Sequence, residues 1–124
     1  MNIEVGPLKL LIERTVIDVG TEIATTAPLM DNDPEKILFE TPLRINFGHY
    51  MLLLYNKWKF ISETPRHLDD LKGQKLESVQ AVSETLELRF SSGDLIQLDT
   101  SDNGFIGPEA LELLGPDNFS VVWN

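Results

Sequence analysis

Two short segments of nearly the same sequence, LRINFG and LRFSSG, stand 45 residues apart, at residues 43–48 and 88–93. In both segments apolar and polar side chains alternate before a glycine. Alternation with a period of two places the apolar side chains on one face of a β-strand, and a glycine after it favours a turn. The chain is therefore expected to fold around β-hairpins.

The second segment predicts a complete hairpin. Its first strand alternates Leu86, Leu88 and Phe90 with charged residues, the turn contains Gly93, and the return strand alternates Ile96 and Leu98 with polar residues. A hairpin of this pattern buries one face and exposes the other to water.

The similarity extends beyond the hairpins and predicts an internal repeat. When residues 43–61 are compared with residues 88–106, six of nineteen positions are identical, whereas average composition gives roughly one or two. Upstream the offset changes from 45 to 60, so the first copy contains roughly fifteen additional residues. We expect a single domain over residues 1–124. Its parts are a first pseudo-repeat at about 11–61 with an insertion at 20–39, a connector at 62–70, and a second pseudo-repeat at about 71–124.

The predicted fold class is mainly β, or α+β with minor helix, with an antiparallel sheet built from the two pseudo-repeats of short strands and hairpins. The tail, residues 110–123, predicts a last hairpin whose type I turn has Pro116 at its second position. A short helix at residues 108–114, ended by Gly115, is the alternative.

The return strand of the first copy differs from that of the second. The second copy is expected to expose Leu95, Gln97 and Asp99, and the 45-residue offset assigns the corresponding outer positions to Tyr50, Leu52 and Leu54. A strand that is apolar on both sides must be covered on both. The insertion, the other copy or another chain would supply that cover.

The charge is strongly negative, with ten Lys and Arg against twenty Asp and Glu and a net charge of −10. Residues 63–124 contain twelve of the acidic residues and four of the basic ones. Nucleic acid and anionic membranes would be repelled, whereas a basic protein would be attracted to the second half. The amino terminus lacks the features of a signal peptide, and a cytoplasmic location is expected.

No residue pattern predicts catalysis, a cofactor or a metal. The chain has no cysteine, and its two histidines, His49 and His67, fall in a turn and in the connector. Residues 99–104 resemble the start of an EF-hand loop, but Ala110 occupies the twelfth position, where a bidentate carboxylate is required. The chain is therefore expected not to be an enzyme.

Residues 71–124, with LKGQKLESV, the LELRFSSGDLIQL hairpin and the GPEALELLGPDNFSVVWN end, resemble small uncharacterised bacterial β-rich proteins. Some relatives of those proteins resemble immunity proteins encoded beside toxins. The resemblance covers under half of the chain and rests on glycines and apolar alternation, so it transfers no functional residue. It implies a protein that binds and neutralises a basic toxin.

Two functional hypotheses follow from these features. The first is a non-enzymatic acidic module that binds a basic protein, and the second is a homo-oligomeric structural or small-ligand-binding protein. Trp58 is expected at an interface edge, and Trp123 is expected to hold the last strand in place. The predicted partner-binding residues are Tyr50, Leu52, Leu54, Trp58, Glu87, Asp99 and Asp102.

Overall fold

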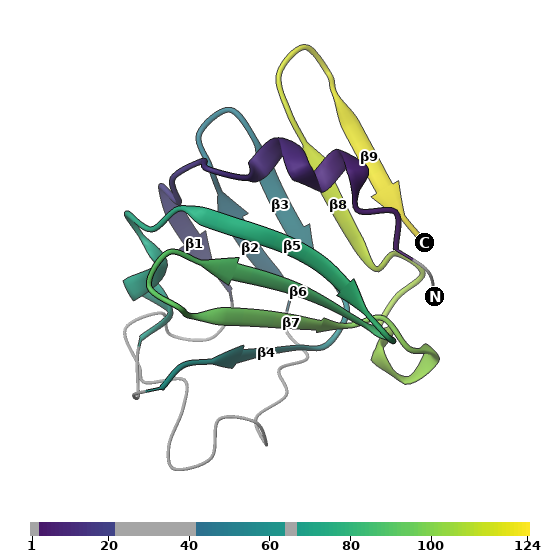
Figure 1. The fold of residues 1–124 in the computed structure, drawn as a ribbon. Helices are drawn as coiled ribbons and strands as arrows, with labels where there is room; N and C mark the ends of the chain where they lie inside the picture. The colour runs from purple at the N-terminus through teal and green to yellow at the C-terminus, as the bar shows by residue number, and fades with distance from the viewer. Residues whose placement is uncertain (1–2, 22–41, 64–66) are drawn as a thin grey trace.

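The structure is a computed structural model that describes residues 3–21, 42–63 and 67–124. Within these residues, nine strands form two antiparallel sheets, and three short 3-10 helices complete the secondary structure (Figure 1). The strands are β1 (Asp18–Gly20), β2 (Leu43–Asn46), β3 (Met51–Leu54), β4 (Trp58–Ile61), β5 (Leu76–Val82), β6 (Thr85–Phe90), β7 (Leu95–Asp99), β8 (Leu111–Leu114) and β9 (Ser120–Trp123). The helices are η1 (Gly6–Leu11), η3 (Leu68–Leu71) and η4 (Asp102–Gly104). The prediction of a mainly β chain is confirmed.

Both halves of the chain contribute to each sheet. The five-stranded sheet has the order β1-β2-β3-β8-β9, and the four-stranded sheet has the order β4-β7-β6-β5. Each predicted repeat supplies a three-stranded meander, β1-β2-β3 to one sheet and β5-β6-β7 to the other. The strand that follows each meander then crosses over, because β4 pairs with β7 and β8 pairs with β3. The origin of the two meanders in a duplication stays a prediction.

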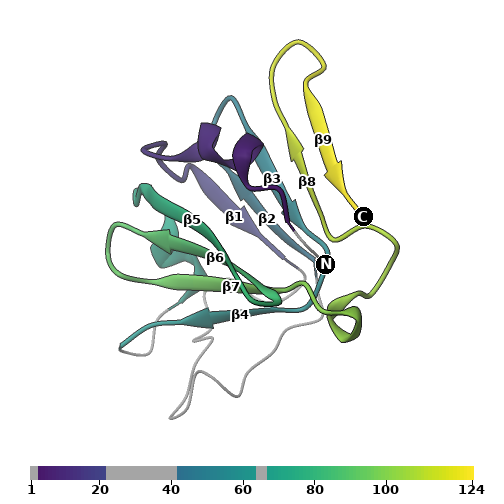
Figure 2. The ribbon, with the colours of Figure 1, turned by 45° about the vertical axis from the view of Figure 1, so that its right-hand side comes forward.

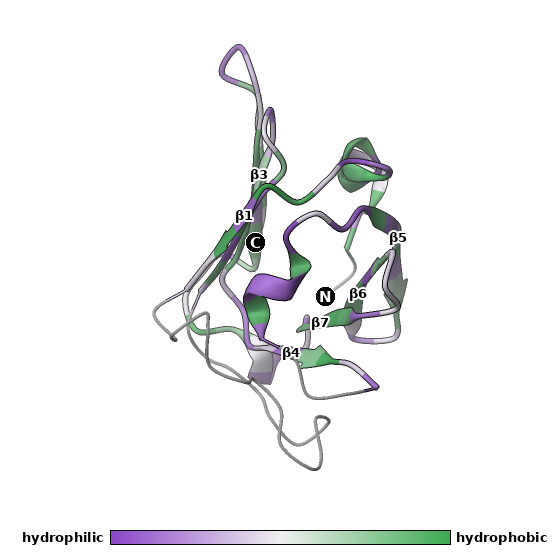
Figure 3. Cartoon of the chain, turned by 90° about the vertical axis from the view of Figure 1, so that its left-hand side faces the viewer, coloured by the Kyte–Doolittle hydropathy of each residue, from purple (hydrophilic) through white to green (hydrophobic). Residues whose placement is uncertain are grey.

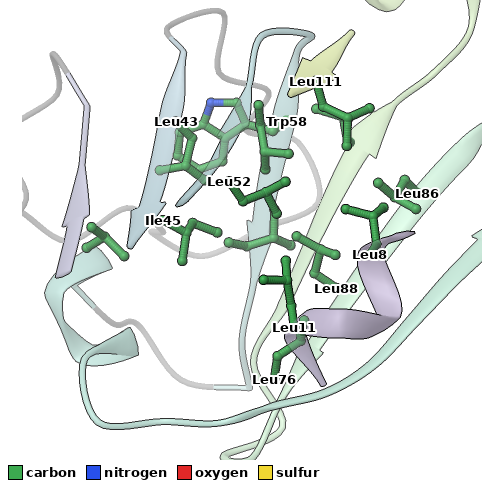
Figure 4. Close-up of a cluster of buried hydrophobic side chains, with 14 of the residues drawn as sticks. Leu8, Leu11, Leu43, Ile45, Leu52, Trp58, Leu76, Leu86, Leu88 and Leu111 are labelled. Atoms are coloured by element: carbon green, nitrogen blue, oxygen red, sulfur yellow. The ribbon is translucent and has the colours of Figure 1, made fainter. Parts of the chain in front are cut away.

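The core lies between the sheets. A side view shows β1 and β3 on one side, β5, β6 and β7 on the other, and the amino-terminal segment between them (Figure 3). Leu8 and Leu11 of η1 are fully buried and belong to the same hydrophobic cluster as Leu52 and Leu88, which come from opposite sheets (Figure 4). Each buried leucine contributes about 1.5–3 kcal/mol of hydrophobic free energy. The short η1 therefore fills the space between the two sheets.

The two hairpins differ in the length of their turns. In the first, Phe47 N–H donates to Tyr50 O at 2.8 Å and encloses the two residues 48–49. In the second, Phe90 N–H donates to Asp94 O at 2.9 Å and encloses the three residues 91–93. One extra turn residue shifts the return strand by one position, and a shift of one residue exchanges the two faces of a strand.

This shift corrects the predicted orientation of β3. Leu52 and Leu54 are fully buried on the inner face, and Met51 and Leu53 form the half-buried outer face. The expectation that Tyr50, Leu52 and Leu54 occupy the outer face is wrong, because it applied the turn length of the second hairpin to the first. The strand is nevertheless apolar on both sides, and the four-stranded sheet covers its inner side.

Two aromatic residues also differ from their predicted roles. Trp58 is fully buried and does not lie at an interface edge. Tyr50 is half-buried: the Arg14 guanidinium lies 4.6 Å from the centre of its ring, and the Phe119 ring meets it edge-on with centroids 6.1 Å apart. Both side chains contribute to packing inside the domain.

The tail forms the predicted hairpin, and the helical alternative is wrong. Leu111 pairs with Trp123 and Leu114 with Ser120. Pro116 is the first residue of the turn, because its carbonyl accepts the Phe119 N–H at 3.1 Å and the central residues are 117 and 118. Both central residues have positive φ, 56° and 63°, which makes this a type I′ turn and corrects the predicted type I.

Trp123 holds the last strand in place, as predicted. Its indole Nε1–H donates to the Glu4 carbonyl at 3.0 Å, and only 6% of the residue is exposed. This bond joins the two ends of the described chain. Figures 1 and 2 show the start of the described amino-terminal segment close to the end of β9.

Two predicted segments are described only in part. Of the insertion at 20–39, only residues 20 and 21 are among the described residues. Of the connector at 62–70, residues 64–66 lie outside them. In its described part the connector enters η3, where the His67 backbone N–H donates to Asp70 Oδ2 at 3.0 Å. No helix in the described ranges is long and apolar enough to cross a membrane.

Candidate functional site

A polar depression of about 380 Å³ lies on the outer face of the four-stranded sheet, near the ends of β6 and β7. We call it the Asp99 depression. Its lining residues come from β4, the β5–β6 turn, β6, β7 and the loop after β7: Lys59, Ser83, Glu84, Thr85, Gln97, Asp99 and Ser101.

The floor of the depression includes Lys59 and Gln97, which belong to a row of polar side chains across three strands. Lys59 pairs with Gln97, and Gln97 pairs with Glu87, so the three lie side by side on one face. The Gln97 amide Nε2–H donates to Glu87 Oε2 at 2.8 Å. Alternation explains this row, because the neighbouring residues Phe60, Ile96 and Leu88 all point into the core.

Asp99 is held at the end of β7 by its own loop. Its Oδ1 accepts hydrogen bonds from the Ser101 backbone N–H at 2.9 Å and from the Ser101 hydroxyl at 2.6 Å. The Asn56 amide donates to the Asp99 carbonyl at 2.8 Å. These bonds fix the carboxylate in position, and among the described residues nothing donates to its second oxygen, which can accept a donor from outside.

The β5–β6 turn forms one wall. The Thr100 N–H donates to the Glu84 carbonyl at 2.9 Å and ties this turn to the end of β7. Ser83 has φ 55°, a conformation that residues with a side chain enter at some cost. The exposed Glu84 thereby lines the same depression as Asp99, and the exposed Asp102 begins η4 immediately after Ser101.

The predicted partner-binding residues divide into two groups. Asp99 lines the depression, Glu87 is bonded to its floor, and Asp102 follows its rim. Leu52, Leu54 and Trp58 are fully buried, and Tyr50 lies between Arg14 and Phe119. The charged residues of the predicted set therefore lie together on one surface, whereas its apolar residues are packed inside the domain and cannot contact a partner there.

Sequence reasoning missed Glu84 and Lys59. Glu84 immediately precedes the alternating strand that contains Glu87. It lies in the two-residue turn between Val82 and Thr85, and a turn position next to that strand could have indicated an exposed acidic residue. Lys59 had no such signal, because its position depends on the pairing of β4 with β7, nearly forty residues away in sequence.

The residues of the EF-hand-like loop have structural roles. Asp99 Oδ1 caps the turn at Ser101, and Gly104 N–H donates to the Ser101 carbonyl at 2.9 Å. Within the described ranges, no group of three or more His, Asp or Glu side chains is arranged to hold a metal ion. His49 and His67 are exposed, one in the β2–β3 turn and the other immediately before η3.

One titratable group outside the depression is strongly perturbed. Tyr55 donates its hydroxyl proton to Glu112 Oε1 at 2.8 Å on the outer face of the five-stranded sheet. Burial, this hydrogen bond and the charges of Glu112 and Glu109 raise the pKa of Tyr55 from 10.0 to about 12. The folded protein therefore holds this proton more tightly than the unfolded chain does.

We expect Tyr55→Phe to lower the free energy of unfolding at neutral pH by about 1 kcal/mol, because one hydrogen bond is lost. The stabilisation in the parent protein is complete below pH 10 and is lost as the pH rises through about 12. Urea unfolding at pH 7, 9 and 11 measures the free energy of unfolding of the parent protein and of the variant as a function of pH. The two curves should converge above pH 10, and a constant difference across this range would contradict the assignment.

A second depression, of about 390 Å³, lies at the outer face of β1, β2 and β3. Its lining residues are Gly20, Thr21, Pro42, Leu43, Arg44 and Leu53. Two of these residues, Thr21 and Pro42, stand at the two ends of a gap in the described residues. None of the described residues that line the Asp99 depression adjoins this gap in the sequence, and this depression is therefore the candidate site.

Comparisons of this chain with protein-family models, curated proteins and solved structures found no match.

Proposed function

We propose that the protein is a non-enzymatic binding module that docks a basic protein at the Asp99 depression. An immunity protein that acts in the bacterial cytoplasm against a nuclease-type toxin is the form of this function that the charge and the sequence resemblance favour. The observation that carries the proposal is that Glu84 and Asp99 line one polar depression with Glu87 and Asp102 next to it, while Lys59 is the one lining cation among the described residues.

The chemistry of the depression suits the head group of an arginine or lysine. Two of the carboxylates are held in place by hydrogen bonds to Ser101 and Gln97. A carboxylate with one oxygen engaged can still accept a guanidinium or ammonium donor on the other, and a charged hydrogen bond of this kind is stronger than a neutral one. The surrounding negative field would chiefly accelerate encounter with a basic partner.

The test measures association with basic nuclease-type toxin domains, including any encoded beside this protein, at several salt concentrations. We expect the association rate to fall as salt rises. The triple variant Glu84→Gln, Asp99→Asn, Asp102→Asn should lower this rate by about tenfold and flatten its salt dependence. Asparagine at 99 keeps an oxygen acceptor for Ser101, so the loop should retain its shape.

Asp117→Asn is the matched control. It also removes a negative charge, but it lies at the tip of the β8–β9 hairpin, far from the ends of β6 and β7 (Figures 1 and 2). Its effect on the association rate should be small. An association rate that is indifferent to salt, or an Asp117 variant that slows association as much as the triple variant, would refute the proposal.

A further inference from the structure

The edges of the two sheets differ in how they are protected against pairing with another strand. An exposed edge strand offers unpaired N–H and C=O groups, and natural proteins discourage pairing there with charges, bulges, proline or very short strands. Here β1 has three residues and begins with Asp18, and β4 contains Lys59. The long β5 contains Glu77 and a register shift between Leu76 and Ser78. Each of these three edges is protected.

The remaining edge strand, β9, has none of these devices. It ends the five-stranded sheet, pairs only with β8 among the described strands, and reads Ser-Val-Val-Trp. The whole segment from residue 118 to residue 124 contains no charged side chain and no proline, in a chain whose net charge is −10. Two copies can therefore approach along β9 without placing like charges opposite one another.

The hydrogen bonds identify which backbone groups of β9 are free. Gly115 N–H donates to the Phe119 carbonyl at 2.9 Å, and Ala110 N–H donates to the Trp123 carbonyl at 2.7 Å. Because backbone groups alternate in direction along a strand, those of residues 119, 121 and 123 face β8. Those of Ser120 and Val122 face away from the sheet, and the Val122 side chain is 44% exposed.

We propose that β9 pairs with β9 of a second copy, antiparallel across a two-fold axis at Val122, and joins two five-stranded sheets into one of ten strands. At this register Val122 faces its own symmetry mate, and their outward N–H and C=O groups form two hydrogen bonds. Ser120 then faces Asn124 of the other copy. The occupant is a second copy because an uncharged antiparallel strand is complementary to itself.

The interface is small and the two copies repel each other, so the dimer should be weak. A four-residue edge buries less than the roughly 1,200–2,000 Å² of a stable complex. Added salt screens the repulsion between the two negative chains, so dimerisation should strengthen as salt rises. This is the opposite of the salt effect expected for a basic partner, and the two proposals can therefore fail separately.

Sedimentation velocity over a range of protein concentrations and two salt concentrations tests the inference. The parent protein should shift from monomer to dimer with rising concentration, more readily at high salt. Val122→Pro removes only an outward N–H, a change that edge strands tolerate, and should weaken dimerisation by about tenfold or more. Val122→Thr keeps the N–H and the β-branched shape and should dimerise like the parent.

A charge pair provides a second test that does not depend on proline. Val122→Lys and Val122→Glu should each be monomeric, because each places like charges opposite one another across the axis. An equimolar mixture of the two should form a heterodimer. A parent protein that stays monomeric at every concentration, a Pro variant that dimerises as well as the Thr variant, or a mixture that stays monomeric would each overturn the inference.

Discussion

Replacing Leu52 by aspartate should unfold the domain. Leu52 is fully buried in the centre of the five-stranded sheet, where it pairs with Ile45 and Leu113, both also fully buried. The substitution removes a core side chain and places a carboxylate with no partner between the two sheets. Losses of this kind exceed about 4 kcal/mol, against a total stability of about 5–15 kcal/mol for a domain.

Leu53→Asp is the matched control for this prediction. Leu53 is the next residue on the same strand, but it is half-buried on the outer face, where it pairs with Arg44 on one side and with Glu112 on the other, so the charges of its two neighbours offset each other for a carboxylate. The expected loss is about 1–2 kcal/mol. Circular dichroism and urea unfolding of both variants measure the difference. A folded Leu52→Asp protein with the parent's unfolding midpoint would mean that β3 faces the other way.

The same two variants distinguish the observed orientation of β3, with Leu52 in the core, from the orientation expected from the sequence, with Leu52 on the outer face. If Leu52 lay on an oligomer interface, its aspartate variant would be a folded monomer. With Leu52 in the core, the variant should lack the cooperative unfolding transition at any protein concentration.

Gly104→Ala should cause the second largest loss of stability. Gly104 is buried in η4, and a methyl group there would collide with the carbonyl oxygen of Asp99 and lie 2.7 Å from its side-chain Cγ. The Lys57 N–H also donates to the Gly104 carbonyl at 2.9 Å, so η4 is held from both sides. Because the colliding atoms include backbone, relief requires the loop to move, at a cost of about 2–4 kcal/mol.

Gly107→Ala is the control in the same loop, because a methyl group at Gly107 meets nothing within 4 Å. Its stability should stay within about 0.5 kcal/mol of the parent. Urea unfolding measures both variants. The Gly104 variant should also slow association with a basic partner, since it displaces Asp99. Equal stability of the two variants would show that η4 does not pack tightly against Asp99.

Much of the local structure follows from patterns of a few residues. Alternation predicted the hairpins around Gly48 and Gly93, both of which have positive φ, and the aromatic residues of the tail predicted its last strand. It also placed Glu87 and Asp99 on a solvated face, because their neighbours Leu88 and Leu98 are apolar and fully buried. These predictions succeeded because alternation and turn chemistry act between residues that are close in sequence.

The sequence-based predictions were wrong where a difference of a single residue in a turn decides which face of a strand is buried or which residue begins the turn. Matching Leu53 with Leu98 by sequence concealed the difference of one residue between the turns, and Leu98 is fully buried whereas Leu53 is half-buried on the outer face. The tail turn was misassigned by one position, because Asp117 and Asn118 can both adopt positive φ and so make Pro116 the first residue.

The sequence by itself determined that this chain forms antiparallel hairpins with a water-facing acidic side, since side-chain alternation and turn residues settle those features locally. Only the tertiary structure decided that β4 and β8 cross between the sheets, which brings Lys59 beside Gln97 and encloses the Asp99 depression. It alone also decided that, among the described strands, β9 ends the five-stranded sheet. Strand order depends on pairing between segments that are far apart in sequence, and every strand offers the same backbone groups to any neighbour.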